Sequence, residues 1–150
     1  MALVREILFR GQTRKYGEKV MMGTGEKLPG RWVYGGIFPG TGDYSIIYGG
    51  DEEVHLDKFV VHSDTVGQYT GKPDKNNTKI FEGDVVRVCL NPEICVGAIE
   101  FDERVGAFIV KFPENKCSPF LDLFVASNKA PGLIWIEVIG NIHDNPELFK

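Results

Sequence analysis

Residues 83–112 read GDVVRVCLNPEICVGAIEFDERVGAFIVKF, and this stretch decides the fold class. It contains short runs rich in β-branched and aromatic residues at 85–90, 95–101 and 107–112, separated by turns that carry Asn, Pro, Asp and Gly. Runs of this length and composition are typical of strands, and strands joined by such short turns form an antiparallel meander. The sequence therefore predicts a sheet at the centre of the chain.

The same pattern extends toward both ends of the chain. Further strands are predicted at 31–38, 44–48, 58–61 and 133–139, with an extended segment at 64–71 and a tight turn at 73–77. Residues 11–30 are polar and rich in glycine, which predicts a loop or a loosely held hairpin tip, and residues 120–125 fit either a strand or a short helix. Asn145 and Pro146 are typical of a helix start, which predicts a short helical turn near the C-terminus.

Together these elements predict a mostly β fold built from short antiparallel strands. Residues 1–66 are expected to form a β-rich N-terminal region. Residues 67–150 are expected to form a small SH3-like barrel that ends in the C-terminal helical turn. The alternative is that both regions form one continuous domain, because a chain of 150 residues is of ordinary single-domain length.

Composition and charge exclude several classes of protein. The chain has 17 Lys and Arg against 21 Asp and Glu, a net charge of −4, and 11% aromatic residues, which is the composition of a globular protein. No apolar window approaches the roughly 20 residues that span a bilayer, and the first residues lack a signal-peptide pattern. The three cysteines, without a C-x-x-C pair, predict buried free thiols in a cytosol. The mild acidity argues against a binder that neutralises nucleic-acid phosphates.

Four blocks of the sequence resemble the YopX family of phage and prophage proteins. They lie in order along the chain, at residues 5–11, 30–36, 65–86 and 138–148. The third block contains TVGQYTG at 65–71 and IFEGDVV at 80–86, and the last reads VIGNIHDNPEL. The resemblance implies a β-rich fold and a phage or prophage origin, in the cytoplasm of a bacterial host. It brings no catalytic residue and no ligand.

One position departs from the family pattern. Asn77 stands where the family usually has glycine after Lys-Asn. Asparagine adopts positive φ more readily than most residues, so we expect the turn to keep its shape.

No complete catalytic or metal-binding constellation is visible in the sequence. His62, Asp64, Glu82 and Asp84 flank the central block and are the candidates for a small metal-dependent hydrolase, but a zinc site needs three or four ligands that converge in space. Glu100, Asp102 and Glu103 cluster near a predicted hairpin tip, where we expect solvated carboxylates with ordinary pKa values. The sequence therefore predicts no catalytic residue, no metal site and no cofactor.

The aromatic residues give the best indication of function. Trp32, Tyr34, Tyr44, Tyr48 and Tyr69 are concentrated in the N-terminal half, and exposed aromatic residues are enriched at protein interfaces. The candidate binding residues are Trp32, Tyr34, Gln68 and Tyr69. They favour a non-catalytic protein-binding or assembly module that contacts a protein partner or a second copy. The alternatives are the hydrolase and a nucleic-acid-binding barrel that uses Lys72, Lys75 and Arg87.

Overall fold

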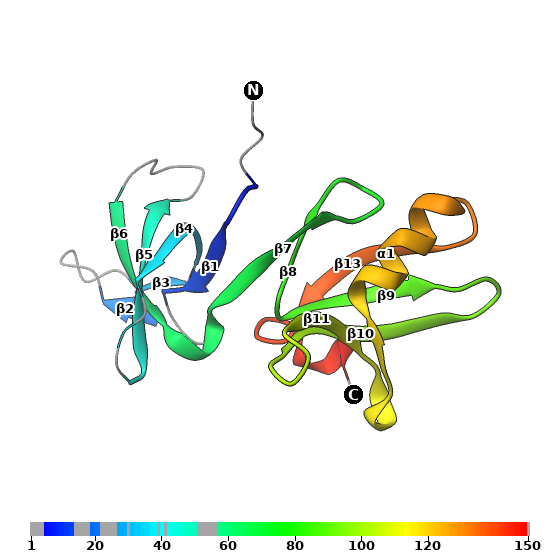
Figure 1. Cartoon of the computed structure of the whole chain (residues 1–150). Coiled ribbons are helices and arrows are strands. Elements are labelled where there is room, and N and C mark those ends of the chain that lie inside the picture. Colours follow the sequence, from blue (N-terminus) through cyan, green and yellow to red (C-terminus); the bar gives the residue numbers. More distant parts are fainter. Residues whose placement is uncertain are drawn as a thin grey trace. The chain divides into compact units, whose positions relative to one another are not determined.

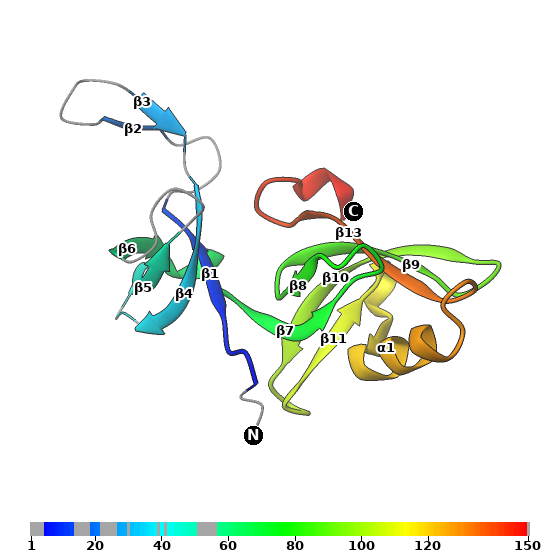
Figure 2. The same ribbon diagram turned by 90° about the horizontal axis from the view of Figure 1, so that it is seen from above.

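A computed structural model describes residues 5–13, 19–21, 27–29, 31–38, 40, 42–50 and 57–149 (Figures 1 and 2). The chain divides into two compact units, Met1–Tyr69 and Thr70–Lys150, each dominated by antiparallel strands. The mostly β fold that the sequence predicts is confirmed. No helix within the described residues is long and apolar enough to cross a membrane.

The N-terminal unit is an antiparallel sheet with a separate small hairpin. Its sheet contains β1 (Phe9–Gln12), β4 (Trp32–Phe38), β5 (Tyr44–Gly50) and β6 (Asp57–His62), in the order β6-β5-β4-β1. Gly67 and Gln68, at the start of β7 (Gly67–Pro73), pair with β1. The hairpin of β2 (Lys19–Met21) and β3 (Lys27–Pro29) falls within the predicted loop of residues 11–30, much of which lies outside the described residues.

Alternation along the strands of this sheet separates a core-facing side from a solvent-facing side. Val33, Ile47 and Val61 come from β4, β5 and β6, and all three are fully buried. The partly buried Phe9, Ile37, Phe59 and Val66 pack against them. The strand β1 also contacts β6, and a Cβ added at Gly11 would lie 2.8 Å from Cγ2 of Val61. A glycine is needed here for space.

The C-terminal unit is an open sheet covered by one helix. Its five strands are β9 (Asp84–Cys89), β10 (Ile94–Asp102), β11 (Ala107–Lys111), β12 (Cys117–Pro119) and β13 (Trp135–Asn141). Their order is β12-β11-β10-β9-β13, and the described strands form no closed barrel. The expected SH3-like barrel is therefore wrong. The meander of β9, β10 and β11 is present, but the sheet has β12 and β13 as its edges.

The helix α1 (Phe120–Lys129) explains why this sheet need not close. Phe120 and Leu123 point into a core formed by Val86, Val88, Ile99, Val110 and Ile136. Figure 2 shows α1 beside the sheet, and its buried residues Phe120 and Leu123 pack in the core of this sheet. Burying each large aliphatic side chain contributes roughly 1.5–3 kcal/mol, so this layer supplies much of the stability of the unit.

The turn between β7 and β8 (Lys79–Phe81) contains the residue that departs from the family pattern. Asn77 has a φ of 64°, as expected from the tolerance of asparagine for this conformation. At the other end of the unit, Pro146–Leu148 form a single 3₁₀ turn, so the predicted helical turn is present. Asn145 makes no side-chain cap there; its Oδ1 instead accepts a hydrogen bond from the Asn141 backbone N–H at 3.4 Å.

Candidate functional site

The solvent-facing side of the N-terminal sheet carries large hydrophobic residues in rows across three strands. Phe38 on β4 pairs with Ile46 on β5, which pairs with Val60 on β6. In the next row Tyr48 of β5 lies between Gly36 and Lys58. We call this surface the aromatic face and define it by Tyr34, Phe38, Tyr44, Ile46, Tyr48 and Val60.

Five of the six residues of the aromatic face are open to solvent, and Ile46 between them is half-buried. Phe38 is 62% exposed, Val60 59% and Tyr48 53%, whereas their sequence neighbours Ile47 and Val61 are fully buried. Isolated exposed hydrophobic residues are common, but contiguous apolar patches on a protein surface mark interaction sites. The exposure follows directly from the strand period of two, because alternate residues of β4, β5 and β6 face outward.

Trp32 and Tyr34, the predicted binding residues on β4, share this side of the sheet. The guanidinium carbon of Arg10 lies 4.6 Å from the centre of the Trp32 ring, and Arg10 itself is buried. The Trp32 ring is therefore partly covered by an arginine of the neighbouring strand, with an attraction of order 1–2 kcal/mol. Tyr34 is exposed and belongs to the aromatic face.

The other two predicted binding residues lie on β7. Gln68 pairs with Phe9, which places it on the core-facing side of the sheet, and it is half-buried. Tyr69 is buried, and its backbone N–H donates to the carbonyl of Leu8 at 2.8 Å. The structure thus brings Trp32 and Tyr34 to one side of the sheet, whereas Gln68 lies on the other side and Tyr69 is buried.

Sequence reasoning missed the exposed Phe38 and Val60 and the half-buried Ile46 that lies between them. Side chains of a strand alternate between its two faces. Once one residue of each of the strands at 32–38, 44–48 and 58–61 is known to be buried, this alternation identifies the residues that face outward. The choice of Trp32, Tyr34, Gln68 and Tyr69 left out both the aliphatic members of the rows and the aromatic Phe38.

The residues proposed for a hydrolase divide between the two units, His62 and Asp64 in the first and Glu82 and Asp84 in the second. His62 is buried and stacks on Tyr44 with ring centres 5.0 Å apart, and it belongs with Asp64 to the N-terminal unit. Asp84 belongs to the C-terminal unit, and its Oδ2 accepts the backbone N–H of Phe81 at 2.8 Å. Across the described part of the chain, no three His, Cys, Asp or Glu side chains gather as a possible metal site.

The acidic cluster near the β10–β11 hairpin contains a close ion pair. Arg104 donates from its Nη2 to Oδ2 of Asp102 at 2.8 Å and from its Nε to Oδ1 of Asp102 at 3.1 Å. These bonds lower the pKa of Asp102, so the expectation of ordinary pKa values is wrong for this residue. Glu100 pairs with Lys111 at 3.5 Å. The arrangement stabilises a hairpin and provides no paired acid and base.

The cysteines are free thiols, as predicted, but they are not all buried. Cys89 and Cys95 are half-buried, and Cys117 on β12 is exposed. Cys89 and Cys95 do not face one another, because Cys89 pairs with Ile94 and Cys95 pairs with Val88.

Two of the three cations proposed for nucleic-acid binding share one carboxylate. Lys75 and Arg87 lie 3.5 Å and 3.4 Å from Oε2 of Glu137. Lys75 also lies over the Trp135 ring, 3.9 Å from its centre. Glu137 offsets one of these two charges, which reduces the excess of positive charge that phosphate binding requires.

Comparisons with known proteins address the family of this chain. No curated protein matches it. The crystal structure of protein EF1440 from Enterococcus faecalis is similar, with 22% sequence identity, a TM-score of 0.46, and coverage of 98% of this chain and 100% of that one. The family model described as YopX protein matches residues 41–150, more than half of the chain, and includes the central and closing blocks. The chain belongs to the YopX family.

Proposed function

We propose that this protein is a non-catalytic assembly module that associates with a second copy of itself through the aromatic face. The observation that carries the proposal is the exposure of Phe38, Tyr48 and Val60 in adjoining rows of one sheet. Removing such side chains from water contributes about 25 cal/mol for each Å² of apolar surface buried, which is the main driving force for association.

A second copy is the occupant that this surface fits best. A symmetric dimer uses the same patch on both subunits, so the patch must be complementary to itself. An apolar face meets this condition, whereas a face of one charge repels its own copy. In addition, β6 pairs only with β5 among the described strands, so Val60 lies on an edge strand, where contacts between chains commonly form.

Size-exclusion chromatography with light scattering over a range of concentrations tests the proposal. We expect the measured mass to rise from that of one chain toward that of two. The double variant Phe38→Thr with Val60→Thr keeps residues that suit strands and should weaken the dimer at least tenfold, because both copies lose the contacts. The matched control is Leu121→Gln with Val105→Thr, which changes two residues that are 63% and 68% exposed elsewhere.

Two results would overturn the proposal. One is the mass of a single chain at every concentration up to the millimolar range. The other is dimerisation that the Phe38 and Val60 substitutions leave unchanged, or that the control substitutions abolish instead, since the contact would then lie on a different surface.

A further inference from the structure

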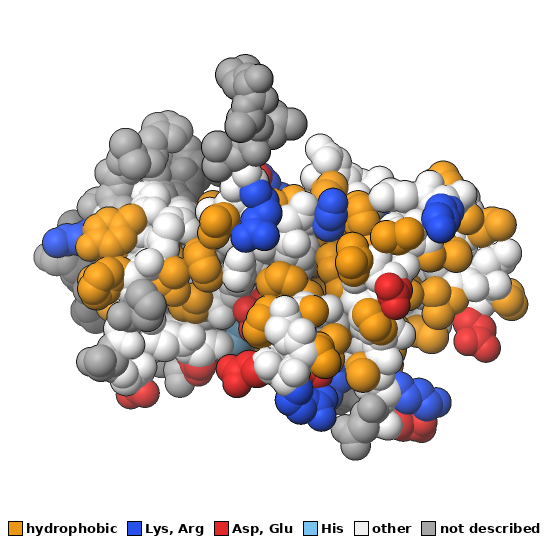
Figure 3. Space-filling model, viewed as in Figure 1, with side chains coloured by type: hydrophobic (Ala, Val, Ile, Leu, Met, Phe, Trp, Pro, Cys, Tyr) orange, Lys and Arg blue, Asp and Glu red, His pale blue; other side chains and the backbone are white. Residues whose placement is uncertain are grey.

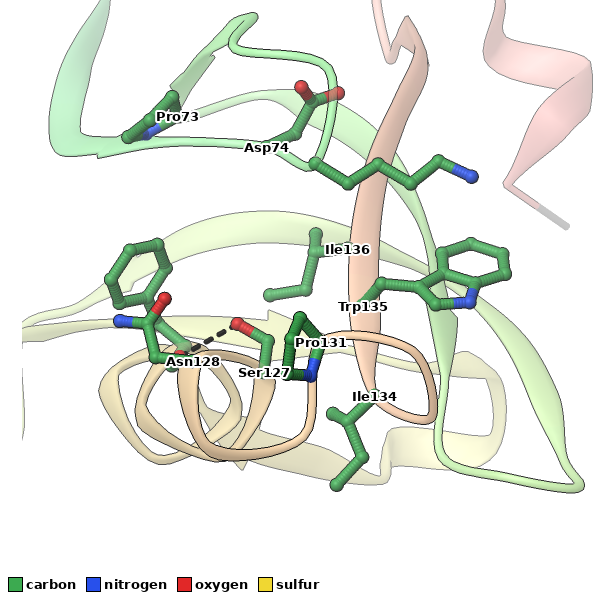
Figure 4. A pocket seen from close by; sticks show the side chains of 10 residues that line it. Pro73, Asp74, Ser127, Asn128, Pro131, Ile134, Trp135 and Ile136 are labelled. Atoms are coloured by element: carbon green, nitrogen blue, oxygen red, sulfur yellow. Dashed lines mark hydrogen bonds between the residues drawn. The ribbon is translucent and has the colours of Figure 1, made fainter.

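The C-terminal unit contains a groove that the proposed self-association does not use. It has a volume of about 180 Å³ and lies between α1, the start of β13 and the turn that follows β7 (Figure 4). Its lining consists of Pro73, Asp74, Lys75, Phe124, Ser127, Asn128, Pro131, Ile134, Trp135 and Ile136. In Figure 4 Ile136 points into the space between Pro73 and Pro131, while Trp135 points to the other side of β13.

Backbone hydrogen bonds fix the walls of the groove. The N–H of Lys75 donates to the carbonyl of Ile136 at 3.0 Å, which ties the β7–β8 turn to β13. The N–H of Ile134 donates to the carbonyl of Ala130 at 2.8 Å and holds the connection that leaves α1. Ile136 also belongs to the hydrophobic core. The groove is therefore formed before any ligand binds, and a ligand does not have to order it.

The inner surface of the groove is mainly apolar. Pro73, Pro131, Ile134 and Ile136 provide aliphatic walls, and Phe124 adds an aromatic one. The hydroxyl of Ser127 is already used, since it donates to the carbonyl of Phe124 at 2.7 Å.

The size of the groove decides what kind of ligand it can hold. Sites for cofactors and other small molecules usually have volumes of roughly 300–1,000 Å³, so a volume of about 180 Å³ is too small for one. The volume of the groove matches that of a single large side chain. Proteins bind an extended segment of a partner in this way, with one anchoring side chain in a pocket and the neighbouring residues on the rim.

The positive charge beside the groove favours a partner segment with an acidic residue close to the anchoring side chain. The Nζ of Lys72 lies 4.9 Å from the centre of the Phe124 ring, and Lys72 is exposed. Of the nearby carboxylates, Asp74 accepts backbone N–H groups from Asn76, Thr78 and Val138. Lys72 therefore offers its positive charge at an apolar opening, and a carboxylate is its complement.

We propose that this groove binds an extended segment of a partner protein in which an apolar anchor residue lies within two residues of Asp or Glu. The anchor fills the space between Pro73, Phe124 and Ile136, and the carboxylate contacts Lys72. In the view of Figure 3, hydrophobic side chains gather over α1 and its neighbours, with isolated charged side chains of both signs among them. The acidic residue of the segment is therefore specified by Lys72 rather than by the surface as a whole.

Selection from a random heptapeptide library on the full-length immobilised protein tests this inference. We expect the enriched peptides to contain Leu, Ile, Phe or Pro within two residues of Asp or Glu, and to bind with micromolar dissociation constants. The variant Asn128→Trp fills the groove from an exposed helix position and should weaken binding at least tenfold. Lys72→Glu should weaken it about fivefold, in line with a single exposed charge contact. The matched controls Val125→Trp and Lys116→Glu should bind as the unchanged protein does.

Three outcomes would overturn the inference. They are a selection without enrichment, enriched peptides without an acidic residue, and peptides whose binding Asn128→Trp leaves unchanged. None of them bears on the self-association test, because the variants at Phe38 and Val60 should bind the selected peptides normally. Failure of one proposal is therefore distinguishable from failure of the other.

Discussion

The carboxylate of Asp74 accepts a hydrogen bond from the backbone N–H of Val138, 64 residues further along the chain, with Oδ2 and N 2.9 Å apart. Through Oδ1 it also accepts the N–H groups of Asn76 at 2.8 Å and Thr78 at 2.9 Å. One buried side chain thus closes the β7–β8 turn and joins it to the edge strand β13. Asp74, which lies within the third block that resembles the YopX family, at residues 65–86, therefore has a structural role.

Replacing Asp74 should therefore destabilise the C-terminal unit. Asp74→Ala leaves the three bonded N–H groups without their acceptor, which should cost about 2–4 kcal/mol in the free energy of unfolding. Hydrogen exchange measured by NMR should show a matching loss of protection at the Val138 amide. Glu103→Ala, on an exposed turn, is the control and should change stability by less than about 0.5 kcal/mol. Unchanged protection at Val138 in Asp74→Ala would refute this role.

The sequence predicted those strands that are long enough to show a recognisable strand pattern of hydrophobic residues. Residues 85–90, 95–101 and 107–112 alternate or carry continuous β-branched residues, and they form β9, β10 and β11. By contrast, β8 and β12 have three residues each, which is too short for a pattern. Residues 120–125 stayed undecided because α1 has apolar residues on both sides: Phe120 and Leu123 are buried, whereas Leu121 and Val125 are exposed.

The barrel prediction was wrong, and the sequence did not locate the aromatic face, for different physical reasons. Closure depends on the register at the edge strands and on whether a helix covers the open face, and neither can be seen in the pattern of a single strand. For the site, the sequence marks aromatic residues but not which side of a sheet is covered. Tyr69 was selected and is buried, while Phe38 was overlooked and is exposed.

The N-terminal sheet should be sensitive to the size of residue 11. Gly11→Ala places a Cβ 2.8 Å from Cγ2 of Val61, inside the core contact, and should cost about 1–3 kcal/mol. Gly36→Ala is the matched control, because nothing lies within 4 Å of its added Cβ. Thermal unfolding measures both changes. Combining Gly11→Ala with Val61→Ala should cost less than the sum of the two single changes, and strict additivity would contradict the contact.

The ion pair at the β10–β11 hairpin predicts a pH dependence. Hydrogen bonds from Arg104 lower the pKa of Asp102 below its ordinary value of 3.8. The pair therefore stabilises the folded hairpin above that ordinary value, and this stabilisation is lost as the pH falls through the lowered pKa. Carboxyl chemical shifts recorded during a pH titration measure the midpoint directly.

Substitutions separate the hydrogen bonds from the charge. Arg104→Ala should return the Asp102 midpoint toward its ordinary value, and Arg104→Lys should do so in part, because lysine keeps the charge but not the paired geometry. Lys129→Ala removes a cation from α1 and should leave the midpoint where it is. A midpoint that Arg104→Ala does not raise would show that another group sets the pKa.

A dilution series followed by backbone amide NMR tests the central claim most directly, because it reports which residues meet when two copies associate. We predict concentration-dependent shifts at Phe38, Ile46, Tyr48 and Val60, with no shifts on β12 or around the groove. Spectra that do not change with concentration, or changes confined to the C-terminal unit, would contradict association through the aromatic face.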